Sequence, residues 1–131
     1  MAVTDIAAVQ ARDEASKGFL SAQMHRAYRL LLKDGSDIFL FEERALRTGI
    51  ATPSLNPIAI DLAKHLNAPF NDLGMAQGVS GLLGVIFARA PAWGSPALPP
   101  DVQRKIWARV QLTGLIAIGA LCVAVALMIL L

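Results

Sequence analysis

The sequence predicts an all-α membrane protein: a small bundle of short helices, a proline-rich spacer, and one C-terminal transmembrane helix. Three observations predict this fold class. No charged residue follows Arg109, residues 110–131 are almost wholly apolar, and four prolines lie within residues 91–100. Upstream of the prolines, apolar residues recur at helical spacing. We therefore expect a cytoplasmic helical domain over residues 1–90, a linker over 91–100 and a collar with a membrane anchor over 101–131.

The terminal apolar segment is long enough to cross a bilayer. Val110–Leu131 comprises 22 residues, and its strongly polar side chains are confined to Gln111 and Thr113. As a helix it would be about 33 Å long, against a hydrocarbon core of about 30 Å. This segment is predicted to be a single transmembrane helix, beginning at a cap near Asp101.

Basic and aromatic residues precede the span and give it a direction. We expect Trp93, Arg104, Lys105, Trp107 and Arg109 to lie at the membrane interface. Because basic residues favour the cytoplasmic side, residues 1–109 are predicted to be cytoplasmic, with the C-terminus across the membrane. The N-terminal residues lack the basic and apolar regions of a secretory signal. Alanine and arginine usage favours a bacterial source, so the predicted location is the bacterial inner membrane.

Small residues line two sides of the predicted span. Close helix packing in lipid depends on such residues, because van der Waals contact replaces the hydrophobic driving force there. One strip comprises Thr113, Ala117, Ala120 and Ala124, and the other comprises Gly119, Cys122 and Ala126. A helix with two small-residue strips suits a position between neighbouring helices. General abundance of alanine would give the same pattern.

The first half of the chain is predicted to be helical in two pieces. Residues 4–33 read as helix with a break at Gly18, and residues 36–47 read as a second helix after the Asp34-Gly35 stop. The Ile38-Phe39-Leu40-Phe41 run could form a strand, but no partner strand is evident. Ile38, Phe39 and Phe41 are therefore interpreted as a partner-binding surface on a helix.

Two further helices are predicted, over residues 56–67 and 71–90. Asn56-Pro57 is typical of a helix start. Residues 73–88 carry no charge, and Gly74, Gly78 and Gly81 would share one helix face suited to close packing. Three placements remain open for this segment: a core or interfacial helix, a re-entrant segment, or a short second span.

Composition excludes several classes of function. A chain of 131 residues is enough for one domain, and a net charge of +2 gives no bulk attraction for nucleic acid. The single cysteine, Cys122, permits neither an intrachain disulfide nor a cysteine-based metal site. We expect no cofactor.

No catalytic motif emerges from the sequence. Asp61 and His65 share a predicted helix face and could form half of a metal site, but the other histidine, His25, lies on a different element. Glu42 and Glu43 are adjacent and would point apart on a helix. The glycines after residue 73 match no phosphate-binding loop. We therefore do not expect an enzyme.

The leading hypothesis is a non-catalytic accessory or assembly subunit of a bacterial inner-membrane complex. Its partners would be other membrane subunits and the lipid bilayer. The alternative is a self-associating scaffold or pore, with residues 73–88 as a second hydrophobic arm. A weaker third possibility is a membrane-tethered enzyme or cofactor binder that uses Asp61 and His65.

Overall fold

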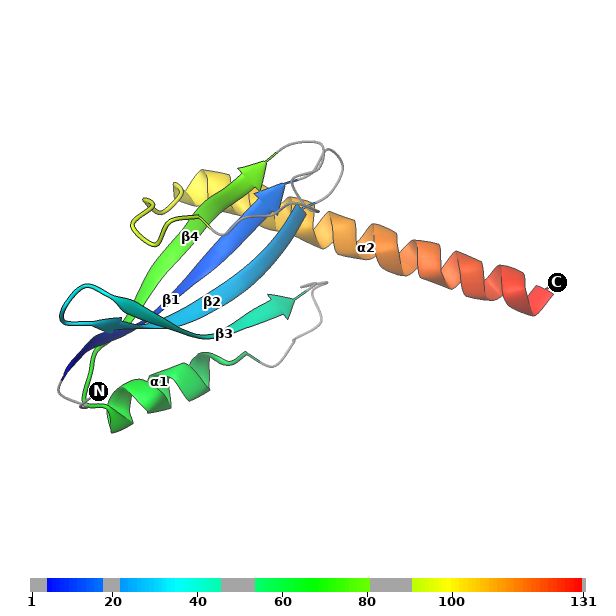
Figure 1. The fold of residues 1–131 in the computed structure, drawn as a ribbon. Helices are drawn as coiled ribbons and strands as arrows, with labels where there is room; N and C mark the ends of the chain where they lie inside the picture. Colours follow the sequence, from blue (N-terminus) through cyan, green and yellow to red (C-terminus); the bar gives the residue numbers. More distant parts are fainter. Residues whose placement is uncertain (1–4, 18–21, 46–53, 81–90, 131) are drawn as a thin grey trace.

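A computed structural model describes residues 5–17, 22–45, 54–80 and 91–130, and it shows a mixed α/β fold (Figure 1). The all-α prediction is wrong, because four segments form one β-sheet. In chain order the elements are β1 (Ile6–Lys17), β2 (Ala22–Leu32), β3 (Asp37–Ala45), α1 (Asn56–His65), β4 (Phe70–Ser80) and α2 (Pro100–Leu130).

The sheet has the strand order β3-β2-β1-β4. β1 and β3 both pair antiparallel with β2, whereas β4 pairs parallel with β1. A parallel partner requires a crossover connection, and α1 lies in the crossover between β3 and β4. β1 and β2 are therefore the internal strands, and β1, which joins the parallel and antiparallel parts of the sheet, is buried on both faces.

Alternation along β1 explains the two faces. The face carrying Val9, Ala11 and Ala15 is covered by both helices and is called the helix face. The opposite face, carrying Gln10, Arg12 and Glu14, is called the strap face. Side chains on both faces of β1 are buried. Successive strand residues point to opposite sides, so this pattern of period two is that of a sheet.

The predicted helices over residues 4–33 and 36–47 are wrong where the structure describes them, because these residues form β1, β2 and β3. The predicted break at Gly18 lies outside the described residues. Alanine, glutamine, arginine and glutamate dominate β1, and each favours helix in isolation. Strand pairing overrides this local preference, because β1 gains hydrogen-bonded neighbours on both edges. The Ile38–Phe41 run also has its partner: Phe41 pairs with Tyr28 of β2, and their rings lie 4.7 Å apart between centroids.

Two apolar clusters pack on the helix face. The first joins Val9, Ala11 and Tyr28 to Ala59 and Ala63 of α1. The second joins residues near the other end of the strands to the first turns of α2, and its buried members are Ala15, Ala22, Met24, Met75, Ile106 and Val110. The two helices thus cover different parts of one sheet face.

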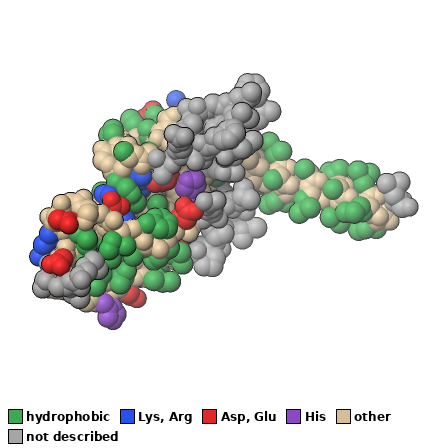
Figure 2. Space-filling view, viewed as in Figure 1, with side chains coloured by type: hydrophobic (Ala, Val, Ile, Leu, Met, Phe, Trp, Pro, Cys, Tyr) green, Lys and Arg blue, Asp and Glu red, His purple; other side chains and the backbone are tan. Residues whose placement is uncertain are grey.

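The predicted helices over residues 56–67 and 101–131 are confirmed as α1 and α2. α1 begins at Asn56 with Pro57 in its first turn, where proline's missing N–H costs no helical hydrogen bond. α2 runs for 31 residues, and its C-terminal part extends away from the sheet with apolar side chains exposed on all sides (Figures 1 and 2).

The helix predicted over residues 71–90 is wrong where the structure describes it, because residues 70–80 form β4. Gly74 has a φ of +76° and lies where the register between β1 and β4 shifts, as in a β-bulge. A Cβ at Gly74 would lie 3.3 Å from that of Ala97. Gly74 therefore serves a backbone turn, Gly78 is a strand residue, and Gly81 lies outside the described residues.

The proline-rich residues 91–99, called the strap, pack along the sheet. At one end, the carbonyls of Pro91 and Ala92 accept hydrogen bonds from Arg12 on the strap face. At the other end, the N–H of Leu98 donates to the carbonyl of Met75 in β4 (2.8 Å), and its side chain packs with the α2 cluster on the helix face. The strap thus passes around the outer edge of β4 and delivers α2 directly to the sheet.

Candidate functional site

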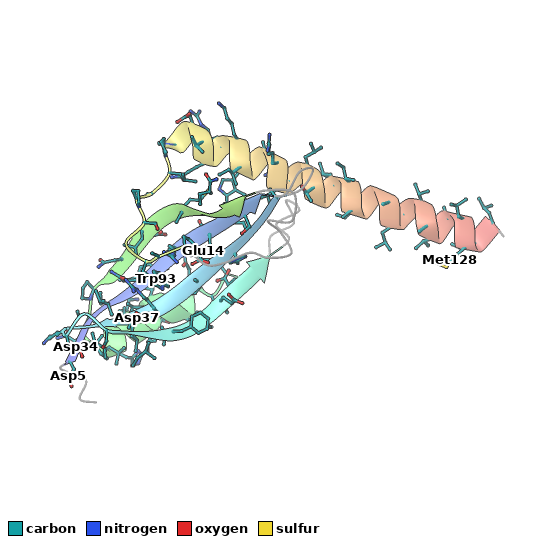
Figure 3. All side chains as sticks on the ribbon, turned by 45° about the horizontal axis from the view of Figure 1, so that its top comes forward. Asp5, Glu14, Asp34, Asp37, Trp93 and Met128 are labelled. Carbon is teal, nitrogen blue, oxygen red and sulfur yellow. The ribbon has the colours of Figure 1, made fainter. Side chains whose placement is uncertain are left out.

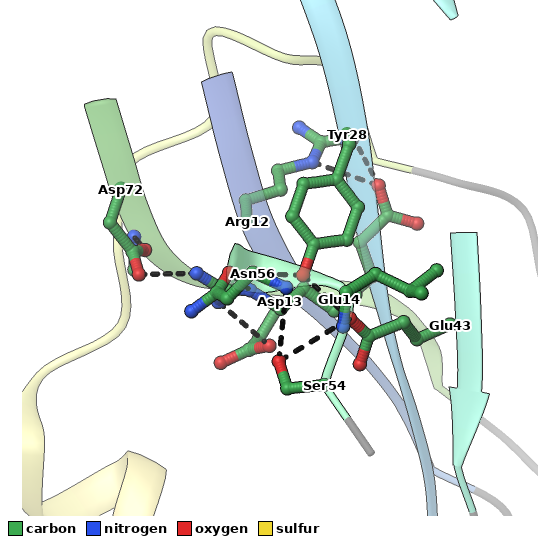
Figure 4. Close-up of polar contacts among 11 residues, drawn as sticks. Arg12, Asp13, Glu14, Tyr28, Glu43, Ser54, Asn56 and Asp72 are labelled. Carbon is green, nitrogen blue, oxygen red and sulfur yellow. Dashed lines mark hydrogen bonds and ion pairs between the residues drawn. The ribbon is translucent and has the colours of Figure 1, made fainter. Parts of the chain in front are cut away.

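A polar network separates the two apolar clusters on the helix face (Figure 4). The buried Arg26 of β2 is at its centre. Its guanidinium pairs with Asp13 (3.1 Å) and Asp72, and its Nε donates to the Asn56 side-chain oxygen (2.9 Å). The bulge at Gly74 helps to position Asp72, whose second oxygen accepts the Gly74 N–H (2.9 Å).

The same network continues through Tyr28 to Glu43. The Tyr28 hydroxyl donates to Glu43 Oε1 (2.6 Å) and lies 2.9 Å from the Asn56 oxygen. Glu43 also accepts the backbone N–H of Leu55, which ties the end of β3 to the start of α1. Burial would lower the pKa of Arg26, but hydrogen bonds and charges from Asp72 and Asp13 raise it above the usual value. The network is therefore a fixed structural link, with its guanidinium permanently charged.

Tyr28 is expected to ionise late. Burial, followed by the hydrogen bond to Glu43, raises its pKa from 10.0 to about 12. A raised pKa means that the folded state favours the neutral phenol, so this stabilisation is present below pH 10 and is lost as the pH rises towards 12. Because Tyr28 is the only tyrosine, phenolate absorbance near 295 nm measures it directly. Tyrosinate that forms at pH 10 in the folded protein would contradict the burial.

A second polar cluster lies on the strap face. Arg12 donates to Glu14 Oε1 through Nε (2.8 Å) and Nη2 (2.6 Å), and His25 Nε2 lies 3.6 Å from the other Glu14 oxygen. Arg29, on β2, donates to the Gln10 side-chain oxygen and pairs with Asp37 (3.5 Å). Burial, and to a smaller extent the charge of Arg12, lowers the pKa of Arg29.

Trp93 of the strap lies against both arginines of this cluster. The guanidinium carbons of Arg12 and Arg29 are 4.1 and 4.3 Å from its ring centroid, within the range of cation–π contacts. Figure 3 labels Trp93 over the strands, well away from the C-terminal part of α2. The structure therefore places the predicted interfacial Trp93 on the sheet, where it fastens the strap.

Trp93→Ala is expected to destabilise the sheet domain by about 1–2 kcal/mol, through loss of two cation–π contacts and apolar contact area. Trp93→Phe retains an aromatic face and should recover about half of the loss. Chemical denaturation in mild detergent, followed by far-UV circular dichroism, measures both. Equal unfolding midpoints for the wild type and Trp93→Ala would show that the strap contributes no stability.

The polar side chains of both clusters are hydrogen-bonded or ion-paired with one another. Among the described residues, no buried side-chain nitrogen or oxygen lacks a hydrogen-bond partner, and no group of three potential metal ligands occurs. The His65 ring lies 2.8 Å from the Asp61 backbone carbonyl, while the Asp61 carboxylate lies 3.3 Å from Lys64. The predicted Asp61–His65 pair does not converge on one point.

The predicted packing residues from Thr113 to Ala126 and the collar residues from Arg104 to Arg109 lie on α2. Thr113 is partly buried and accepts the Ala22 N–H (3.3 Å), whereas Ala117, Gly119, Ala120, Cys122, Ala124 and Ala126 are exposed. Arg104, Lys105 and Arg109 are exposed, and Trp107 packs against the α2 cluster. α2 is the one helix among the described residues that is long and apolar enough to cross a membrane.

Of the three residues of the predicted partner surface, two are exposed and one is in the core. Ile38 and Phe39 are exposed, with 58% of Phe39 accessible, on the edge strand β3. Phe41 instead packs on Tyr28 and belongs to the core. Sequence reasoning missed the Arg26 and Arg12 clusters, because their members come from separate strands and share no local spacing. Alternation of Gln10, Arg12 and Glu14 was the one signal available.

No protein-family model, curated protein or solved structure matches this chain.

Proposed function

We propose that this protein is a membrane-anchored, non-catalytic accessory subunit of a bacterial inner-membrane complex. The observation that carries the proposal is the division of α2. Its first turns pack on the sheet through Ile106 and Val110, while Leu115–Leu130 presents apolar side chains on all sides. A surface of that kind is stable in contact with lipid or with other apolar helices.

The sheet domain supports a role in contact rather than catalysis. Its buried arginines and carboxylates are engaged with one another across the described strands. Ile38 and Phe39 are both exposed, on opposite faces of the edge strand β3, and an edge strand can accept a further strand from a partner. The basic residues at the start of α2 favour a cytoplasmic sheet domain under the positive-inside rule.

The test is co-purification in mild detergent with a matched pair of variants. Phe39 and Ile58 are 58% and 57% exposed, on β3 and α1 respectively. Phe39→Asp is expected to lose the co-purifying membrane subunits, whereas Ile58→Asp retains them. Both variants should fold, because neither side chain is in the core.

Three outcomes would contradict the proposal or part of it. If the wild-type protein migrates alone on native gels after gentle extraction, it is not a subunit of a complex. If both variants retain the subunits equally, β3 is not the contact surface. A mass corresponding only to multiples of this chain would favour the self-associating alternative.

A further inference from the structure

The domain and the anchor are joined without a spacer. Ile106, Val110 and Gly114 of α2 are buried, and Thr113 accepts a hydrogen bond from Ala22 at the start of β2. The next residue, Leu115, is exposed, and so is every described residue after it. The boundary between the helix that packs on the sheet and the helix that stands free therefore falls at Gly114.

The length of the free helix brings the sheet to the membrane surface. Residues 115–130 span about 24 Å, and extending the apolar stretch back to Leu112 gives about 28 Å. The hydrocarbon core is about 30 Å thick, so the apolar stretch that begins directly after Gln111 matches it in length. Gln111 then lies at the boundary of the core, and the sheet, which hydrogen-bonds to Thr113 through Ala22, must touch the headgroup layer.

Three exposed basic side chains lie on α2 just above this boundary. At about 100° per residue, Arg104 and Lys105 point away from the face that carries Ile106 and Val110, and Arg109 lies on the flank of that face. All three are exposed, and no described residue forms an ion pair with them. The neighbouring acidic residue, Asp101, leaves this group with a net charge of +2.

Their heights match a headgroup layer. Measured from Gln111 along the helix, Arg109 is about 3 Å above the boundary, and Lys105 and Arg104 are about 9 and 10 Å above it. A headgroup layer is about 5–7 Å thick, and the screening length in physiological salt is about 8 Å. Long basic side chains can also extend towards phosphates. Arg109 thus lies within the layer, and the other two lie within reach of it.

We propose that Arg104, Lys105 and Arg109 bind anionic lipid headgroups and thereby hold the sheet domain against the membrane surface. The inference rests on membrane insertion of α2, proposed above. Because Ile106 and Val110 fix α2 to the sheet, lipid bound to these basic side chains also fixes the orientation of the domain. Strands β1, β3 and β4 run in the same direction as α2, so their C-terminal ends face the bilayer (Figure 1).

The test uses the full chain, purified alone and reconstituted in phosphatidylcholine vesicles containing a trace of spin-labelled lipid. The fraction of label immobilised by the protein is compared for labelled phosphatidylglycerol and labelled phosphatidylcholine. A basic residue near the surface contributes about 1 kcal/mol, so a preference of about fivefold for phosphatidylglycerol is expected. The preference should fall towards unity in Lys105→Gln/Arg109→Gln and in molar salt.

The control is a variant matched in charge, Lys33→Gln/Lys64→Gln. These exposed lysines lie at the end of the sheet opposite the anchor, after β2 and in α1. The control should retain the wild-type preference. Equal immobilisation of both labelled lipids by the wild type, or the same loss in both double variants, would overturn the inference.

Alkaline extraction separates this inference from the proposal on which it rests. If alkali releases the wild type from the vesicles, α2 is not inserted, and both proposals fail. If the protein resists alkali but shows no lipid preference, only the headgroup contact fails. Loss of a protein partner from Lys105→Gln/Arg109→Gln, without any lipid preference in the wild type, would assign the basic residues to an acidic protein and overturn the lipid inference.

Discussion

Ile106→Ala is expected to lower the free energy of unfolding of the sheet domain by about 3 kcal/mol. Ile106 is 1% exposed and packs against Met24 and Met75 in the α2 cluster. The surrounding residues include Ala15 and Ala22, whose small side chains cannot move in to fill the space. The cost therefore combines lost burial with a persistent cavity.

The matched control for this variant is Ile116→Ala, ten positions further along the same helix. Ile116 is 61% exposed on the free part of α2, so its loss should change the unfolding free energy by less than about 0.5 kcal/mol. Urea denaturation in mild detergent, followed by tryptophan fluorescence, measures both. Equal effects of the two variants would show that α2 does not dock on the sheet.

Arg26→Met is the second change expected to have a large effect, about 2–3 kcal/mol. It removes the positive charge between Asp13 and Asp72 and leaves two carboxylates facing each other, together with the Asn56 oxygen. Losing one partner of a buried ion pair costs about 3–5 kcal/mol. The smaller figure applies because Asp72 is half exposed and water screens its charge.

A second substitution separates charge from packing. Asp13→Asn in the Arg26→Met background removes one of the two like charges that face each other and should recover about 1 kcal/mol. As a control, Lys64→Met breaks the exposed pair with Asp61 and should cost less than about 0.5 kcal/mol. If Arg26→Met and Lys64→Met shift the urea midpoint equally, the network contributes no more than a surface pair.

Both helices could be predicted from the sequence because their signals are local. Asn56-Pro57 specifies a helix start, and α2 carries a long apolar run behind Asp101. Their interaction with the rest of the chain is not local. The docking of Ile106 on Met24 and Met75 depends on segments that are far apart in sequence.

The sheet could not be predicted because one of its internal strands resembles a helix in composition. β1 alternates Val9 and Ala11 with Gln10 and Arg12, but its second face is polar and buried rather than solvated. Apolar–polar alternation is typical of a strand with one solvated face, so it does not indicate that the polar face of β1 is covered. Burial of Arg12 depends on Glu14 and on Trp93, and no local pattern around β1 indicates that distant tryptophan.

In the candidate site, too, local features could be predicted and contacts between distant segments could not. Phe39 and the basic residues on α2 are exposed, and the surface roles expected of them stay predictions. By contrast, Trp93 was assigned to the membrane interface from its amphipathic ring, yet the same ring stacks on Arg12 and Arg29. A tryptophan near a span has two partners of similar chemistry, a headgroup or a guanidinium, and sequence alone does not distinguish them.

The pairing of β4 with β1 has a consequence for biogenesis. During synthesis β1, β2 and β3 emerge first and can pair as consecutive antiparallel strands. The other edge of β1 stays unpaired until residues 70–80, which form β4, have been synthesised. The α2 cluster forms later still, because Met24 and Met75 are covered only after Ile106 and Val110 have been synthesised. The nascent sheet therefore keeps an apolar surface that only α2 covers. Completion of the sheet domain and arrival of the long apolar helix are thus one assembly event, and a delay in either exposes the chain to chaperones and proteases.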